Sequence, residues 1–201
     1  MTKIAALLVL AGSVTAANAQ TWAEQGEAGD LPSTANITDG AGPLLSITGG
    51  LGASDVDMFC INITDEAAFT ATFDGAFDSQ LWLFNSAGLG VTYNDDGPGG
   101  LNSFIDSTNV LSNGTYYLAI SRYNRDATSA GGLIWNNSPF TGQNVPSGPG
   151  AASPVTGWTG TTTGGVTYVI TLTGAEYCVP TPGAAALLGL GGLAMGRRRR
   201  A

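Results

Sequence analysis

Four aspartates in two short stretches of the chain could build a site for a hard cation. Asp55 and Asp57 lie in one stretch, and Asp95 and Asp96 lie in the other, within the NDDG sequence of residues 94–97. Calcium takes about six to eight oxygen ligands from carboxylates and carbonyls, so the four carboxylates predict a calcium site if the fold brings them together. Asn, Asp and Gly at this density also build tight turns without a metal, and the spacing is not that of an EF-hand loop. The turn and the calcium site are both open interpretations at this level.

The residue inventory argues against catalysis. The chain has no His, which removes Ser-His-Asp and Cys-His nucleophile systems and His-ligated zinc or haem sites. Two cysteines cannot make a four-thiolate site, and no P-loop or βαβ dinucleotide unit occurs. A glycosidase needs only two carboxylates about 5 to 10 Å apart, which some pair among fifteen acids meets by chance. We therefore expect no enzyme, and no cofactor apart from the candidate calcium.

Two tryptophans lie in a long segment, residues 124–165, that is rich in Gly, Ser, Thr and Pro. Trp135 and Trp158 could stack on sugar rings, which makes a glycan-binding module of an exopolysaccharide matrix the alternative function. Linkers rarely contain such aromatics, so we expect the segment to pack on the domain. A loose insertion is the competing interpretation.

The elements that must position these residues are β-strands. Residues 57–63 alternate, with Phe59, Ile61 and Ile63 on one face. Residues 81–84, LWLF, are apolar on both faces and predict a central strand. Further strands are predicted at residues 44–48, 67–73, 103–111, 114–123 and 165–174. Short strands with Gly and Asn turns predict an all-β domain, a single β-sandwich of jelly-roll-like type, after an extended acidic segment at residues 20–31.

The first 19 residues predict a secretory signal peptide. Lys3 precedes an apolar run over residues 4–11, and Ala17-Asn18-Ala19 forms an A-x-A cleavage site. An N-terminal helix of the domain is the alternative. We therefore expect an exported protein whose domain spans residues 20–178.

The chain ends in a short apolar stretch and a basic cluster. Residues 183–196 carry no charge and would span about 21 Å as a helix, less than the roughly 30 Å of a hydrocarbon core. Arg197, Arg198, Arg199 and Arg200 follow, and such a cluster resists translocation. This layout predicts a transmembrane helix that tethers the exported chain transiently to the inner membrane. A permanent anchor is the alternative.

The sequence Val179-Pro180-Thr181-Pro182, the apolar stretch and the Arg cluster, together residues 179–201, resemble the PEP-CTERM sorting signal of bacteria. The usual Pro-Glu-Pro of that family is here Pro-Thr-Pro. The resemblance implies that an exosortase-like enzyme cuts near the Pro motif and passes the protein to the cell surface or the extracellular matrix.

Residues 54–123 resemble a second family, the bacterial pre-peptidase C-terminal (PPC) domain. They contain, in order, SDVDMFCINI, FDSQLWLFNSAGLGVTYNDDGPGGLNSFID and LSNGTYYLAI. The family pattern is an Asp-x-Asp-x-Phe strand, a Leu-rich strand, an Asn-Asp-Asp loop and a Gly-Thr-Tyr-Tyr strand. The resemblance implies a jelly-roll-like sandwich with a non-catalytic accessory role, and it permits bound calcium.

The net charge of the domain limits the classes of molecule that it can bind. Within residues 20–178 the cations are Arg122 and Arg125, against all fifteen carboxylates, which gives a net charge of 2 − 15 = −13. Such a surface attracts cations and does not favour nucleic acid or anionic lipid. The membrane is a partner only through the C-terminal stretch.

The two cysteines, Cys60 and Cys178, predict a disulfide. Their number is even, and an export compartment favours oxidation. The bridge would hold the end of the domain to its body. Two buried free thiols, or a Cys178 that serves the sorting chemistry instead, are the alternatives.

Overall fold

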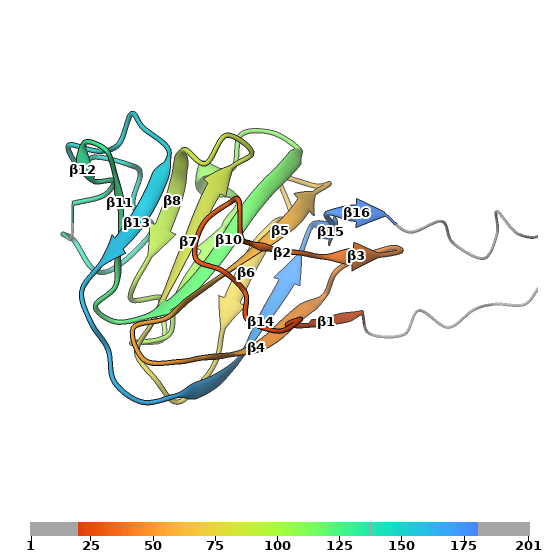
Figure 1. Cartoon of the computed structure of the whole chain (residues 1–201). Coiled ribbons are helices and arrows are strands. Elements are labelled where there is room, and N and C mark those ends of the chain that lie inside the picture. The colour runs from red at the N-terminus through yellow and green to blue at the C-terminus, as the bar shows by residue number, and fades with distance from the viewer. Residues whose placement is uncertain (1–19, 137, 181–201) are drawn as a thin grey trace, which may run out of the picture.

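The computed structural model describes residues 20–136 and 138–180 (Figure 1). The predicted signal peptide of residues 1–19 and residues 181–201 of the predicted sorting tail, which spans 179–201, lie outside the described residues. The described part is all-β and forms a β-sandwich, which confirms the all-β sandwich of the predicted fold class. None of the described residues forms a helix with the length and hydropathy that a membrane span requires.

Two main sheets make the sandwich. The five-stranded sheet has the order β1-β4-β14-β6-β9, and the larger sheet has the order β15-β5-β10-β7-β8, with β2 also paired to β5. The strands of the first sheet are β1 (Thr21–Ala23), β4 (Ser46–Leu51), β14 (Val166–Thr173), β6 (Thr70–Phe73) and β9 (Phe104–Asp106). Those of the second are β15 (Ala175–Tyr177), β5 (Val56–Ile63), β10 (Gly114–Arg122), β7 (Ser79–Asn85), β8 (Gly90–Asn94) and β2 (Asn36–Ile37).

The five-stranded sheet buries only one face. Along β14, Tyr168, Ile170 and Leu172 are buried while the threonines between and after them are exposed. This alternation is the sequence signature of an antiparallel strand with one solvated face, and it confirms the prediction for residues 165–174.

The larger sheet is buried on both faces, which explains the apolar sequence of β7. Leu81 and Leu83 point into the core between the two main sheets, whereas Trp82 and Phe84 enter a second core. The same division separates Phe59 from Met58 on β5. The prediction of a central strand at residues 81–84 is confirmed, since β7 lies between β10 and β8.

Residues 124–165 supply the cover of the second core. They contain a small sheet of β12 (Gly132–Leu133), β11 (Asp126–Ser129) and β13 (Val155–Thr159). Figure 1 shows this sheet beside β7 and β8. Ala127, Ile134, Trp135 and Val155 are buried against the outer face of the larger sheet. We call residues 124–165 the excursion; it packs on the sandwich rather than forming a loose insertion.

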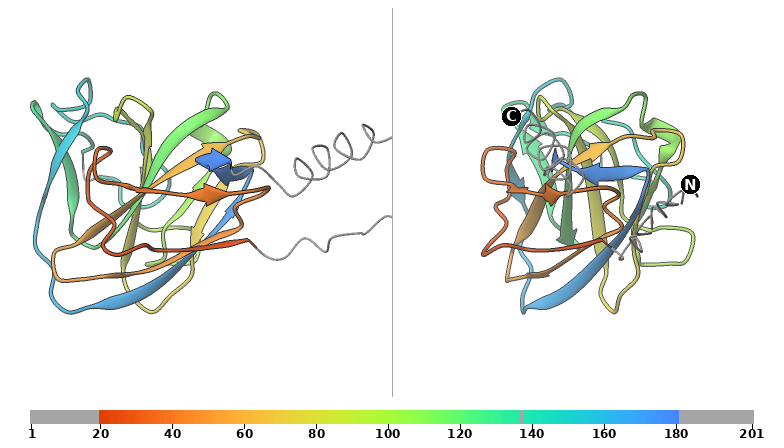
Figure 2. Two further views of the ribbon diagram at one scale, coloured as in Figure 1. Left: turned by 45° about the vertical axis from the view of Figure 1, so that its right-hand side comes forward. Right: turned by 90° about the vertical axis from the view of Figure 1, so that its right-hand side faces the viewer.

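The described ends of the chain lie at the same end of the sandwich (Figures 1 and 2). There β16 (Val179–Pro180) pairs in parallel with β3 (Asp39–Gly40). Cys60 of β5 and Cys178 form a disulfide with Cα atoms 5.5 Å apart, which confirms the predicted bridge. The bridge therefore ties β5 to the segment that leads into the Pro motif.

Candidate cation sites

The four aspartates predicted to form one site do not lie in one cluster. Asp57 on β5 pairs with Ile120 on the neighbouring strand β10. Ile120 pairs with Leu81 on β7, and Leu81 pairs with Asn94 on β8. Three strand spacings of about 4.8 Å separate Asp57 from the end of β8, where Asp95 follows. The single four-aspartate site is therefore wrong: the order of strands divides it into two groups, each completed by acids that the sequence pattern did not point to.

The first group, which we call the N-terminal acidic site, consists of Glu24, Glu27 and Asp57. One carboxylate oxygen of each lies within 4.8 Å of those of the other two. Asp57 is 0% exposed and points between the two main sheets, in phase with Phe59. Glu27 is exposed, so the site is open to water on one side. A carboxylate cluster of this kind, with a solvent-facing member, has the donor chemistry of a calcium site.

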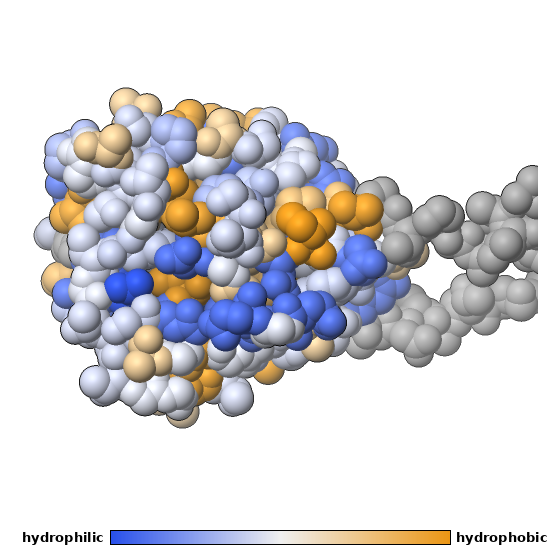
Figure 3. Space-filling model, in the orientation of Figure 1, coloured by the Kyte–Doolittle hydropathy of each residue, from blue (hydrophilic) through white to orange (hydrophobic). Residues whose placement is uncertain are grey.

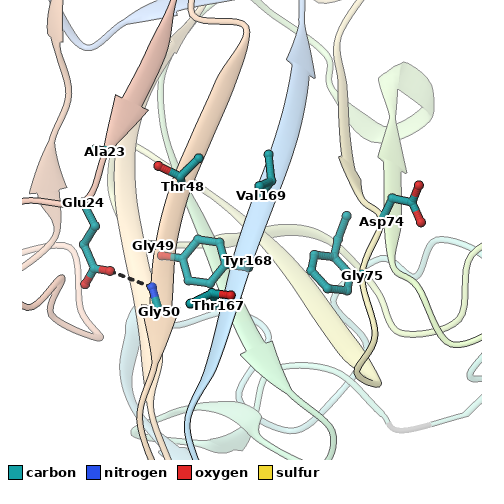
Figure 4. Close-up of a pocket in the computed structure, with 11 residues that line it drawn as sticks. Ala23, Glu24, Thr48, Gly49, Gly50, Asp74, Gly75, Thr167, Tyr168 and Val169 are labelled. Carbon is teal, nitrogen blue, oxygen red and sulfur yellow. Dashed lines mark hydrogen bonds between the residues drawn. The ribbon is translucent and has the colours of Figure 1, made fainter.

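Backbone and side-chain donors hold two of these carboxylates in place. The amides of Ala28 and Gly50 donate to Oε1 and Oε2 of Glu24, both at 2.9 Å, and Figure 4 shows the bond to Gly50. The hydroxyl of Tyr168 donates to Oδ2 of Asp57 at 2.6 Å. Oδ1 of Asp57 is buried and has no hydrogen-bond partner. The site therefore contains one buried carboxylate oxygen that is left for a ligand.

Gly49 makes room for this arrangement. A Cβ atom on Gly49 would collide with the hydroxyl of Tyr168 and with Oε2 of Glu24. In Figure 4 the ring of Tyr168 lies beside Gly49, and the carboxylate of Glu24 points towards the same stretch of β4. These residues also line an open groove of about 600 Å³. The absence of a side chain at position 49 is thus a requirement of the site.

Asp55 has a different role from Asp57. Its Oδ2 accepts from the amide of Gly52 at 2.7 Å and its Oδ1 from the amide of Val56 at 2.9 Å. Asp55 therefore builds the turn before β5, as the turn interpretation predicts. Its charge still reaches the site, because repulsion from Asp55 is the main cause that raises the pKa of Glu27.

Burial and crowding disfavour negative charge at this site. Burial, and then repulsion from Glu24, Asp55 and Glu27, raise the pKa of Asp57 to about 8, although the bond from Tyr168 acts in the opposite direction. No arginine is among the causes of this shift. A bound cation would supply the missing positive charge.

Asp95 and Asp96 join Asp78 in a second group, which we call the loop site. One carboxylate oxygen of each lies within 4.8 Å of those of the other two. Asp95 is 2% exposed, whereas Asp78 and Asp96 are half-buried. The turn at this loop is built mainly by Asn94, whose side chain bonds three backbone groups.

The two tryptophans proposed for sugar stacking do not form a platform. Trp135 is 1% exposed and packs against Trp82, Phe84 and Tyr93 in the second core. Trp158 is half-buried, and its indole donates to the carbonyl of Asp30 at 2.8 Å. The stacking prediction is corrected: the excursion uses these rings to fill the core beneath it, which leaves Trp135 without an exposed face.

Glu24, Glu27 and Asp78 are the site residues that the sequence patterns missed. The acidic composition of residues 20–31 was the available signal for the first two, and the Gly-Gly pair of β4 was a further sign of close packing. Asp78 directly precedes the LWLF strand, and nothing local marks it as a partner of Asp95. No protein-family model matches the chain, and no curated protein matches its sequence.

Proposed function

We propose that this protein is an exported, non-catalytic β-sandwich module that binds calcium at the N-terminal acidic site. The observation that carries the proposal is the buried carboxylate of Asp57, whose Oδ1 has no partner beside Glu24 and Glu27. Ionisation of a buried carboxyl without a counter-charge costs several kcal/mol, and a bound cation offsets that cost.

The donor set favours calcium over other common metals. All three side chains offer carboxylate oxygens, which suit hard cations, and no His or thiolate is present to select zinc. Magnesium demands a near-ideal octahedron, whereas calcium accepts irregular sites with more ligands. Water at the exposed side, next to Glu27, would complete the coordination shell.

The location of the module is part of the same proposal. The N-terminal segment directs export, and the tail from Val179 is processed by an exosortase-like enzyme, which places the protein on the cell surface or in the extracellular matrix with exopolysaccharide as the partner class. The disulfide supports an oxidising compartment. The resemblance to the PPC family supports a jelly-roll-like accessory module that accompanies other secreted components.

Thermal unfolding in calcium and in chelator tests the metal site. At a calcium concentration about 100 times Kd, binding adds about 2.7 kcal/mol, which raises Tm by about 5 to 10 °C for a domain of this size. The rise should shrink in Asp57→Asn, which keeps an acceptor for Tyr168 but removes the charge. Asp65→Asn is the matched control, because Asp65 is exposed and caps only the amide of Ala68. Equal shifts in the two variants would overturn the assignment of the site.

Intact-mass measurement of the extracellular protein tests the proposed processing. The mature form should lack Arg197 to Arg200, and removal of these four residues should misdirect the chain. An extracellular form that keeps its RRRRA end would contradict the sorting proposal without affecting the calcium proposal.

A further inference from the structure

We infer that Asp78, Asp95 and Asp96 form a second divalent-cation site, independent of the N-terminal acidic site, that fastens the excursion to the sandwich when calcium binds. This inference does not rest on the proposed function, since the two sites share no residue.

The topology explains why these three aspartates meet. β7 and β8 are antiparallel neighbours, with Leu81 in register with Asn94. Asp78 directly precedes β7, and Asp95 and Asp96 directly follow β8, so the two ends reach the same edge of the sheet. The three carboxylates, with oxygens within 4.8 Å of one another, can surround a single ion.

A buried oxygen without a partner points to a ligand at this position. Asp95 is 2% exposed, and its Oδ1 has no hydrogen-bond partner. The Oδ1 atom of Asp78 is also buried and also has no hydrogen-bond partner. Two orphaned carboxylate oxygens in one cluster are costly in the absence of a cation or a proton.

The turn does not account for these aspartates. Asn94 uses its amide nitrogen to bond the carbonyls of Asp96 at 3.0 Å and Gly142 at 2.7 Å, and its Oδ1 accepts from the amide of Phe104 at 2.7 Å. With Asn94 in this role, the carboxylates of Asp95 and Asp96 are free for another function. The loop residues therefore have different roles. Asn94 builds the turn, and the side chains of Asp95 and Asp96 form the cluster with Asp78.

The local charges agree with this assignment. Burial, followed by repulsion from Asp78, Asp96 and Asp126, raises the pKa of Asp95 to about 7, and no arginine is among the causes. Neutral pH therefore leaves a proton and a cation in competition for the same buried oxygen.

The backbone around the loop site connects it to the excursion. The amide of Tyr123 donates to the carbonyl of Asp78 at 3.0 Å, directly before the excursion begins. Asp96 exchanges bonds with residues farther along, since its amide donates to Phe140 at 3.1 Å and its carbonyl accepts from Gly142 at 3.2 Å. An ion held by Asp78 and Asp96 would hold the residue that leads into the excursion, Tyr123, together with residues 140–142 inside it.

Isothermal titration with calcium separates the two sites. The oxidised domain should bind two calcium ions, and Asp95→Asn and Asp57→Asn should each bind one. Asp78→Asn, at a half-buried position, gives a second test of the loop site if Asp95→Asn folds poorly, and Asp65→Asn should keep both ions. A wild-type stoichiometry of one, lost in Asp57→Asn but kept in Asp95→Asn and Asp78→Asn, overturns the inference and leaves the proposed function intact. One ion lost only in the loop variants supports the inference and rejects the N-terminal site.

Hydrogen exchange supplies a readout that a purely structural role would not change. Calcium should slow exchange of the Asp96 and Gly142 amides by about tenfold or more in the wild type and in Asp57→Asn. It should have no effect on these amides in Asp95→Asn. Calcium protection that persists in Asp95→Asn would overturn the inference.

Discussion

The N-terminal acidic site and the loop site both consist of three carboxylates, but hydrogen bonds hold the carboxylates in place mainly in the first site. In the first, Glu24 accepts hydrogen bonds from two backbone amides, and Asp57 accepts one from the hydroxyl of Tyr168. In the second, the hydrogen bonds position the backbone, and buried oxygens of both Asp78 and Asp95 stay unpartnered. Fixed ligands lose less entropy when a metal binds. We therefore expect tighter binding at the N-terminal site and a larger ordering effect at the loop site.

Each site also connects a different pair of segments. The N-terminal site joins the residues after β1 to the start of β5, within the main sandwich. The loop site lies at the edge of the larger sheet. Tyr123, which leads into the excursion, and residues 140–142 inside it are bonded to the backbone of the site. A hydrophilic band crosses the face of the molecule shown in Figure 3, in keeping with the domain's large excess of acids. Calcium at the first site would hold the two main sheets together. Calcium at the second site would hold the excursion to the sandwich.

Gly49→Ala should give the largest difference between the sites. The new Cβ would collide with Tyr168 and Glu24, so we expect about 3 kcal/mol of lost stability in chelator and about 6 kcal/mol in calcium, where binding at the N-terminal site is lost as well. Gly50→Ala is the matched control, because a Cβ there meets only the carbonyl of Val166 at 3.4 Å. Denaturant unfolding with and without calcium measures both. Equal losses in the two variants would contradict the packing argument.

The pH dependence of stability in chelator should show the cost of the buried acids. Folded Asp57, with a pKa raised to about 8, keeps a proton that the unfolded chain releases near its ordinary value of 3.8. Folding therefore takes up a proton in this range, and stability should fall as pH rises, by about 2 to 4 kcal/mol between about pH 5 and pH 8. Asp57→Asn should show a flatter curve, and saturating calcium should flatten the wild-type curve. A wild-type curve in chelator that rises with pH over this range would contradict the prediction.

Asn94→Ala should affect the loop site alone. The side chain is 1% exposed and makes three hydrogen bonds to the backbone, so we expect a loss of about 2 to 3 kcal/mol and of the second calcium ion. Asn102→Ala, in the same loop with a single bond to Asp74, is the control and should bind two ions. If Asn94→Ala also abolished binding at the N-terminal site, the independence of the two sites would be rejected.

Asp55→Asn should give the smallest effect and should define the border of the N-terminal site. Asn keeps one of the two acceptors that bond Gly52 and Val56, so stability should change by about 1 kcal/mol or less. Titration should still find two calcium ions, with somewhat weaker binding through the lost charge. Complete loss of the first ion would make Asp55 a ligand rather than a turn former.

Local patterns predicted the strands well, because alternation records which face of a strand is buried. Alternation did so for β14, which has one solvated face. In β5 and β10 it separated the residues of two buried faces, and the apolar run of β7 correctly indicated a strand buried on both faces. They missed β8 and the strands of the excursion, whose Gly-, Ser- and Thr-rich sequences lack alternation.

The sites depended on information that no local pattern contains. The separation of Asp57 from Asp95 follows from the order of four strands, and the approach of Glu24 to Asp57 follows from the pairing of β1 with β4. Trp135 was a candidate for stacking on sugar rings, yet the doubly buried larger sheet needed an apolar cover and this ring supplies part of it. Cys60 and Cys178 were predictable because their number left a single pairing.

Anomalous diffraction from crystals grown in calcium tests the central claim most directly. The account predicts two anomalous peaks, each about 2.4 Å from a carboxylate oxygen: one at Oδ1 of Asp57, beside Glu24 and Glu27, and one at Oδ1 of Asp95, beside Asp78 and Asp96. Crystals in saturating calcium with no peak at Asp57, and with water as the neighbour of its Oδ1, would contradict it.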